Sequence, residues 1–140
     1  MISDETQYRF VTSQIADRLN RATNALKLFV QTFSAIVGGS IYLATGVSAV
    51  SGARPQYALL SNVAVTLLTF VCSIIVLEAL RGWYGYRKVQ AQLGGVGSNG
   101  KHNIPPPKLF PAGLAEIAMV IGMLAACGLF WRFNPFTLSN

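Results

Sequence analysis

Four charged side chains stand at the ends of long uncharged runs, which makes them the first candidates for chemistry. They are Lys27, Glu78, Arg81 and Glu116. Ionisable groups in or beside a membrane segment are costly and are usually paired. Because all four are expected at a similar depth, we expect an interfacial rim of ion pairs that fixes helix register. A proton or cation site is the alternative.

A polar stripe in the second uncharged run is the next candidate. Its members recur at spacings of four, three and four residues, within about 60° of one helix face, and they are Asn62, Thr66, Thr69 and Ser73. Such side chains commonly bond to helix carbonyls or to a neighbouring helix. One wall of a polar pathway is the alternative.

Small residues in the first and third runs are candidates for close helix packing. They are Gly38, Gly39, Ala118, Gly122 and Ala126. In lipid, where no hydrophobic force drives helices together, small residues allow backbones to approach closely. We expect such packing either within one chain or between chains.

The remaining reactive residues are too few and too far apart to predict an enzyme. Cys72 and Cys127 are expected at different depths, farther apart than the Cα separation of about 7 Å that a disulfide allows. With His102 as the only histidine, we expect no metal site, no cofactor and no catalytic residue. Residues 95–101 match G-x-x-x-x-G-K, but His102 replaces the Ser or Thr of a phosphate-binding loop and Pro105 follows within four residues, so nucleotide binding is not expected.

Three uncharged apolar runs carry these candidates, at residues 28–53, 55–77 and 117–131. About 18 or more mostly apolar residues cross the roughly 30 Å hydrocarbon core of a bilayer. The chain is 52% hydrophobic and 11% charged, against about 25% charged in a soluble domain. These features predict an all-α integral membrane protein with three transmembrane helices.

The third run is the shortest, and its 15 residues make only about 22 Å of helix. Extending it back to residue 109 includes Pro111, which a first helical turn tolerates, and Glu116. A re-entrant segment is the alternative to a full span.

The first transmembrane helix is expected to continue from an N-terminal amphipathic cytosolic helix. Apolar residues recur there every three or four positions, and residues 3–37 contain no Pro. The apolar side could lie on the membrane surface or pack against a second protomer. It could also be an extension of the span that the second loop covers.

The expected organisation follows in six segments. They are an N-terminal helix (1–27), transmembrane helices one (28–53) and two (54–80), a basic Gly/Pro-rich cytosolic loop (81–108), transmembrane helix three (109–132) and a short external tail (133–140).

Basic residues predict the orientation. Nine of the eleven Lys and Arg fall before the first run or between the second and third, which places those segments in the cytoplasm by the positive-inside rule. The N-terminus is then cytoplasmic and the C-terminus external. The run of residues 27–39 resembles small bacterial membrane proteins, which implies the inner (plasma) membrane.

We interpret the net charge of +6 as a sign that the chain contacts anionic lipid and not nucleic acid. The expected partners are therefore the lipid bilayer and either a homo-oligomer or other membrane-protein subunits. Three functions remain open: a non-catalytic accessory or scaffold subunit, a self-assembling membrane-permeabilising protein such as a holin-like or toxin/defence effector, and a small oligomeric channel or transporter subunit.

Overall fold

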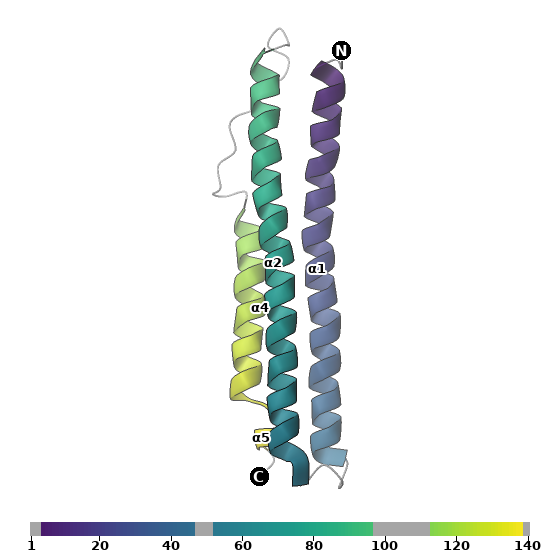
Figure 1. Ribbon diagram of the computed structural model, residues 1–140, viewed down its shortest axis with the longest axis vertical. Helices are drawn as coiled ribbons and strands as arrows, with labels where there is room; N and C mark the ends of the chain where they lie inside the picture. The colour runs from purple at the N-terminus through teal and green to yellow at the C-terminus, as the bar shows by residue number, and fades with distance from the viewer. Residues whose placement is uncertain (1–3, 47–51, 97–112, 139–140) are drawn as a thin grey trace.

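Two helices of 43 residues each run antiparallel and side by side along the whole length of the molecule (Figure 1). The computed structural model describes residues 4–46, 52–96 and 113–138. The helices in these residues are α1 (Asp4–Gly46), α2 (Arg54–Val96), α4 (Leu114–Arg132) and α5 (Pro135–Leu138).

The α1–α2 contact is a seam of buried residues that mostly recur at spacings of three, four or seven positions on both helices. This spacing matches the 3.5-residue repeat that lets two long helices stay in contact. The buried apolar members are Val11, Ile15, Ala22, Ala25, Phe29 and Ala44 on α1, and Ala58, Val65, Cys72, Val76, Ala79 and Trp83 on α2. Many are small, so the two helix backbones approach closely.

Arg18 lies at a seam position between Ile15 and Ala22 on α1. Its guanidinium lies 6.0 Å from the ring centroid of Tyr86, within the range of a cation–π contact. Gly82 makes room for it, because a Cβ there would lie 3.1 Å from the Arg18 Cζ. The seam therefore holds one charged residue in a specific register.

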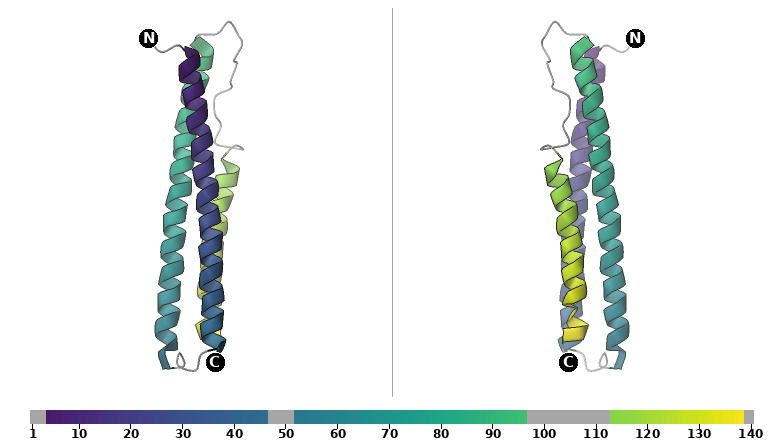
Figure 2. Two further views of the ribbon diagram at one scale, coloured as in Figure 1. Left: turned by 90° about the vertical axis from the view of Figure 1, so that its right-hand side faces the viewer. Right: turned by 90° about the vertical axis from the view of Figure 1, so that its left-hand side faces the viewer.

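α4 lies beside α2 over part of the hairpin (Figure 1), and α5 lies at the end where α1 ends and α2 begins (Figure 2). The 19 residues of α4 make about 28 Å of continuous helix. Met123 of α4 joins Phe29 and Val76 in the main core cluster. Phe136 of α5 packs with Ala44 and Ala58 in a second cluster.

The sequence placed the start of the second loop too early. Residues 81–96 continue α2 as helix, instead of beginning the cytosolic loop at residue 81. The physical reason is tertiary: Trp83 is buried with Val11 and Ile15, so the helix keeps a packing partner. Residues 97–112 lie outside the described residues, as does most of the 95–101 motif.

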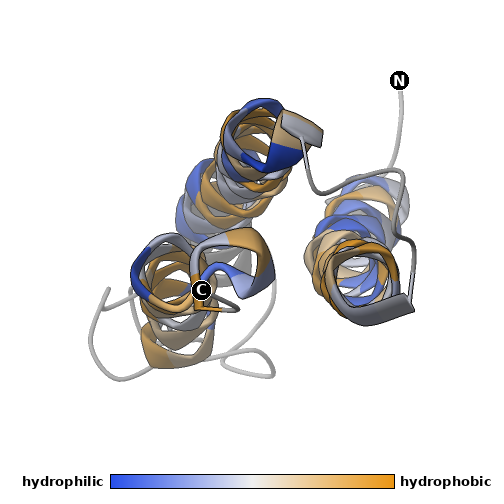
Figure 3. Ribbon diagram, turned by 90° about the horizontal axis from the view of Figure 1, so that it is seen from below, coloured by the Kyte–Doolittle hydropathy of each residue, from blue (hydrophilic) through white to orange (hydrophobic). Residues whose placement is uncertain are grey.

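Among the described residues, three helices are long and apolar enough to cross a membrane, which confirms the expected all-α class with three helices of spanning length. Apolar residues lie on outward as well as inward sides of the helices, as the view from below shows (Figure 3). Leu60, Leu67 and Phe70, for example, are each about three-fifths exposed (65, 59 and 63%). A protein that is apolar on its outside suits a lipid environment.

Candidate functional site

The polar stripe of α2 is partly satisfied by its own helix. The hydroxyl of Thr66 donates to the carbonyl of Asn62 at 2.8 Å, and the hydroxyl of Thr69 donates to the carbonyl of Val65 at 2.8 Å. The Ser73 hydroxyl is buried and has no hydrogen-bond partner among the described residues. Backbone bonding of this kind is routine for Ser and Thr in membrane helices.

Two members of the stripe also bond to the C-terminal helices. The indole N–H of Trp131 on α4 donates to the Thr66 hydroxyl at 2.9 Å, and the Cys127 Sγ lies 3.8 Å from the same oxygen. The Asn134 amide donates to the Asn62 Oδ1 at 2.8 Å. Asn62 and Thr66 therefore tie α2 to α4 and to the turn that follows it.

Asn134 is the polar residue that the sequence reasoning missed. It is fully buried, and its Nδ2 also lies within 3.3 Å of the Ala58 carbonyl and 3.0 Å of the Ser61 hydroxyl. Its Oδ1 accepts the backbone N–H of Phe136 at 3.0 Å. One amide thus caps α5 and bonds to the first turns of α2.

A local signal could have identified Asn134. Asn is a favoured N-cap residue, and proline is favoured at the first helical position. The pair Asn134–Pro135 has this form and begins α5. What the pair does not reveal is the partner on α2, because that contact joins residues more than 70 positions apart.

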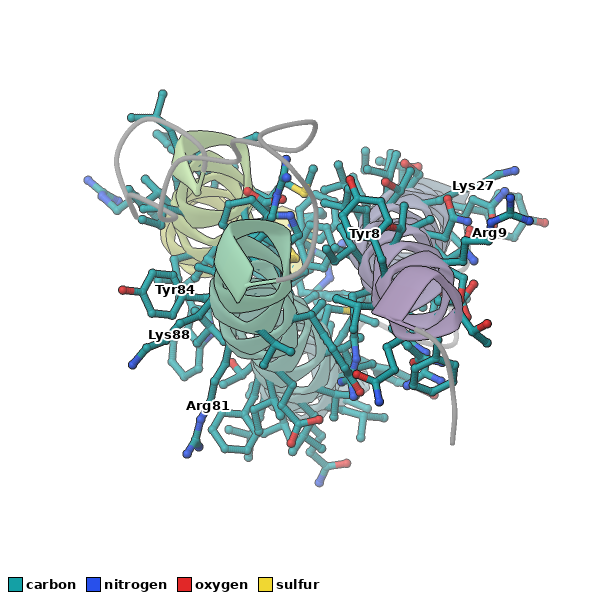
Figure 4. The ribbon with its side chains drawn as sticks, turned by 90° about the horizontal axis from the view of Figure 1, so that it is seen from above. Tyr8, Arg9, Lys27, Arg81, Tyr84 and Lys88 are labelled. Carbon is teal, nitrogen blue, oxygen red and sulfur yellow. The ribbon has the colours of Figure 1, made fainter. Side chains whose placement is uncertain are left out.

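The residues of the expected interfacial rim lie in different surroundings. Lys27, Glu78 and Arg81 are exposed, whereas Glu116 is buried. Lys27 and Arg81 point away from one another on opposite sides of the hairpin (Figure 4). The Glu116 Oε2 has no hydrogen-bond partner within the described part of the chain, and the structure gives no ion pair among these four described residues, so the rim stays a prediction.

The small residues expected at helix contacts face open space or a groove. A Cβ added at Gly38, Gly39 or Gly122 would meet no atom within 4 Å. Ala118, Gly122 and Ala126 line an open apolar groove of about 490 Å³ between α1 and α4. The three glycines thus make no close contact with another of the described helices, and packing between chains stays a prediction.

Phe29 and Phe33 form part of the α1 wall of this groove. Their rings stack with centroids 5.4 Å apart, and Phe33 meets Phe130 of α4 edge-on at 6.0 Å. These aromatic rings bring α1 and α4 into contact beside the groove.

Both cysteines, Cys72 in the core and Cys127 beside Thr66, are free thiols. Within residues 4–46, 52–96 and 113–138, His, Cys, Asp and Glu form no group of three or more that could hold a metal ion. No family model, curated protein or solved structure matches the chain.

Proposed function

We propose that this chain is an integral membrane protein of the bacterial inner membrane that serves as a non-catalytic scaffold or accessory subunit of a membrane complex. Its N-terminus is cytoplasmic in this proposal and its C-terminus is external. The hairpin of α1 and α2 acts as a stalk that carries the binding surface for other subunits or for further copies of the chain.

The observation that carries this proposal is the length of the hairpin. Each helix has 43 residues, about 65 Å at 1.5 Å per residue. A bilayer with its headgroups is about 40–45 Å thick. About 20 Å or more of two-helix stalk therefore stands outside the membrane if the apolar parts span it.

The stalk has a core cluster of its own. Val11 and Ile15 of α1 pack with Trp83 of α2, close to the N-terminal end of the hairpin. The guanidinium of Arg87 lies 5.9 Å from the Trp83 ring centroid. Packing of this kind supports a rigid projection, which suits a scaffold.

The contacts of the polar stripe favour a scaffold over a permeabilising protein or a channel. Asn62 and Thr66 use their polar atoms to bind Asn134 and Trp131 of the same chain. Groups engaged in this way stabilise the bundle and are less available to line a polar pathway.

A pair of neighbouring substitutions tests the proposal. Ile15 is buried in the stalk core and Ala16 beside it is exposed. Ile15→Asn places a polar group in the seam and should disrupt the stalk, while Ala16→Asn should not. After crosslinking in native membranes and extraction in mild detergent, wild type and Ala16→Asn should migrate in native gels as defined complexes, and Ile15→Asn should lose them while remaining membrane-integrated.

Two results would overturn the scaffold function. One is a wild-type chain that remains a single copy without partner subunits at every concentration. The other is rapid release of a trapped dye from vesicles that contain only the purified chain, since this would support the permeabilising alternative.

A further inference from the structure

One row of side chains follows the outward face of α2 for eight turns. Its members alternate at spacings of three and four, the period of one helix face, and each is exposed: Leu60, Val63, Leu67, Phe70, Ile74, Leu77, Arg81, Tyr84 and Lys88. We call this set the outer row. It lies opposite the seam, so no other described helix covers it.

The chemistry of the outer row changes once along its length. From Leu60 to Leu77 all six members are apolar, and from Arg81 to Lys88 the three members are basic or amphipathic. An apolar face suits acyl chains, whereas Arg, Lys and Tyr suit the headgroup level. The change therefore marks where one side of α2 would leave the hydrocarbon.

The first two polar members, Arg81 and Tyr84, fit within the thickness of a headgroup layer, and Lys88 lies beyond it. This layer is about 5 to 7 Å thick on each side of a bilayer. Arg81 to Lys88 covers about 10 Å of helix at 1.5 Å per residue. With Leu77 in the acyl chains, Arg81 and Tyr84 lie among headgroups, and Lys88 lies just above them, within about one Debye length of 8 Å.

The positive charge at one end of the outer row indicates that this part of the surface attracts a negatively charged ligand. Arg81, Tyr84 and Lys88 point outward together on one side of α2, whereas Lys27 and Arg9 lie on the far side of α1 (Figure 4). No member of the outer row is acidic, and Glu78 is the exposed acidic residue next to it. Arg87 differs from these three, because its guanidinium stacks on the Trp83 ring.

We propose that Arg81, Tyr84 and Lys88 form a binding surface for the headgroups of anionic phospholipids. The basic side chains attract the phosphate and its negative charge, and the Tyr84 ring sits at the boundary with its hydroxyl towards water. This inference rests on the membrane placement in the proposed function, and it adds a lipid class and a named surface.

The test uses the full chain in bilayers of equal parts zwitterionic phosphatidylcholine and anionic phosphatidylglycerol. Spin-labelled forms of the two lipids give the ratio of their association constants at the protein surface. Wild type should favour phosphatidylglycerol. Arg81→Gln should lower the ratio by up to about fivefold, which corresponds to about 1 kcal/mol per basic residue near the surface.

Three further variants separate this surface from a general charge effect. Lys88→Gln should lower the ratio less than Arg81→Gln, because Lys88 lies farther from the headgroups. Glu78→Gln should raise the ratio, since it removes the nearby negative charge. Arg9→Gln is the matched control, because it also removes one positive charge. Arg9 lies about 27 Å along α1 from Lys27, the residue before the first apolar run, so its loss should leave the ratio unchanged.

The outcomes distinguish this inference from the proposed function. An unchanged ratio in Arg81→Gln, or an equal fall in Arg9→Gln, overturns the lipid surface and leaves the scaffold proposal standing. A chain that shows the selectivity but never assembles overturns the scaffold alone. A chain that does not enter the bilayer overturns both.

Discussion

The side chain of Asn134 connects two helices of the bundle. Its amide bonds at once to the start of α2 and to the first turn of α5. A buried polar group with all its partners in place fixes one arrangement, and its loss leaves those partners unsatisfied. We therefore expect Asn134 to hold the C-terminal turn against α2.

Asn134→Ala should lower the free energy of unfolding by about 2 kcal/mol, since it removes an N-cap and a buried donor. Asn134→Asp keeps an acceptor for the Phe136 N–H but turns a carboxylate towards the acceptors of Ala58, Ser61 and Asn62. It should cost at least as much as alanine near neutral pH and less in acid, where the protonated carboxyl regains a donor. Denaturant titration in detergent at two pH values measures both; a smaller loss for Asp than for Ala at pH 7 would contradict the donor assignment.

Two glycines of α2 offer a matched test of the Arg18 position. A Cβ at Gly85 would meet nothing within 4 Å, but a Cβ at Gly82 would lie 3.1 Å from the Arg18 Cζ. Gly85→Ala should stabilise the helix by up to about 1 kcal/mol, the usual difference in helix propensity. Gly82→Ala should gain less, because Arg18 must move off Tyr86. Equal gains in thermal unfolding would show that Arg18 does not occupy the seam.

At the scale of the elements, each long helix has one face for its neighbours and another for the surroundings. On α2, Val76 is fully buried in the main core cluster, whereas Leu77 beside it is 48% exposed. In lipid the exposed face contributes little to helix association, because acyl chains replace protein contacts at no cost in apolar solvation. Packing on the seam then carries the stability of the bundle.

This difference predicts an unusual ranking of two truncations. Val76→Ala should lower the free energy of unfolding by about 2 kcal/mol through the cavity that it leaves. Leu77→Ala should have almost no effect, although it removes more atoms. Unfolding in mixed detergent micelles measures both variants. A larger loss at Leu77 would mean that another chain covers this face.

At the scale of the whole molecule, the unequal distribution of basic residues predicts which end of the hairpin faces the cytoplasm. Arg9, Arg81 and Lys88 lie towards the N-terminal end, and Arg54 begins α2 at the other. Arg54 donates to the Ala44 carbonyl at 3.1 Å, so its side chain also caps the end of α1.

Single cysteines on a background with Cys72 and Cys127 changed to alanine test the orientation. Thr12 and Gln56 are both exposed, at opposite ends of the hairpin. Gln56→Cys should react with a membrane-impermeant maleimide in intact cells. Thr12→Cys should react only after the membrane is opened, and the reverse pattern would invert the topology.

The helical class, the three apolar segments and the polar positions on α2 could be predicted from the sequence, because they depend on composition and on the 3.6-residue period of a helix. It also predicted that the polar groups of α2 would bond locally or across helices, as Thr66 and Asn62 do. The end of α2 could not be predicted in this way, because it depends on tertiary contacts: residues 81–96 stay helical, and Trp83 packs on α1.

Which residues meet each helix face could also be learned only from the tertiary structure. It buried Asn134 against α2, left Gly38 and Gly122 facing open space, and turned Lys27 away from Arg81. Periodicity places residues on a helix face, but which neighbour meets that face depends on contacts between residues far apart in the chain. For this reason the candidate chemistry was visible in the sequence, while its pairing was not.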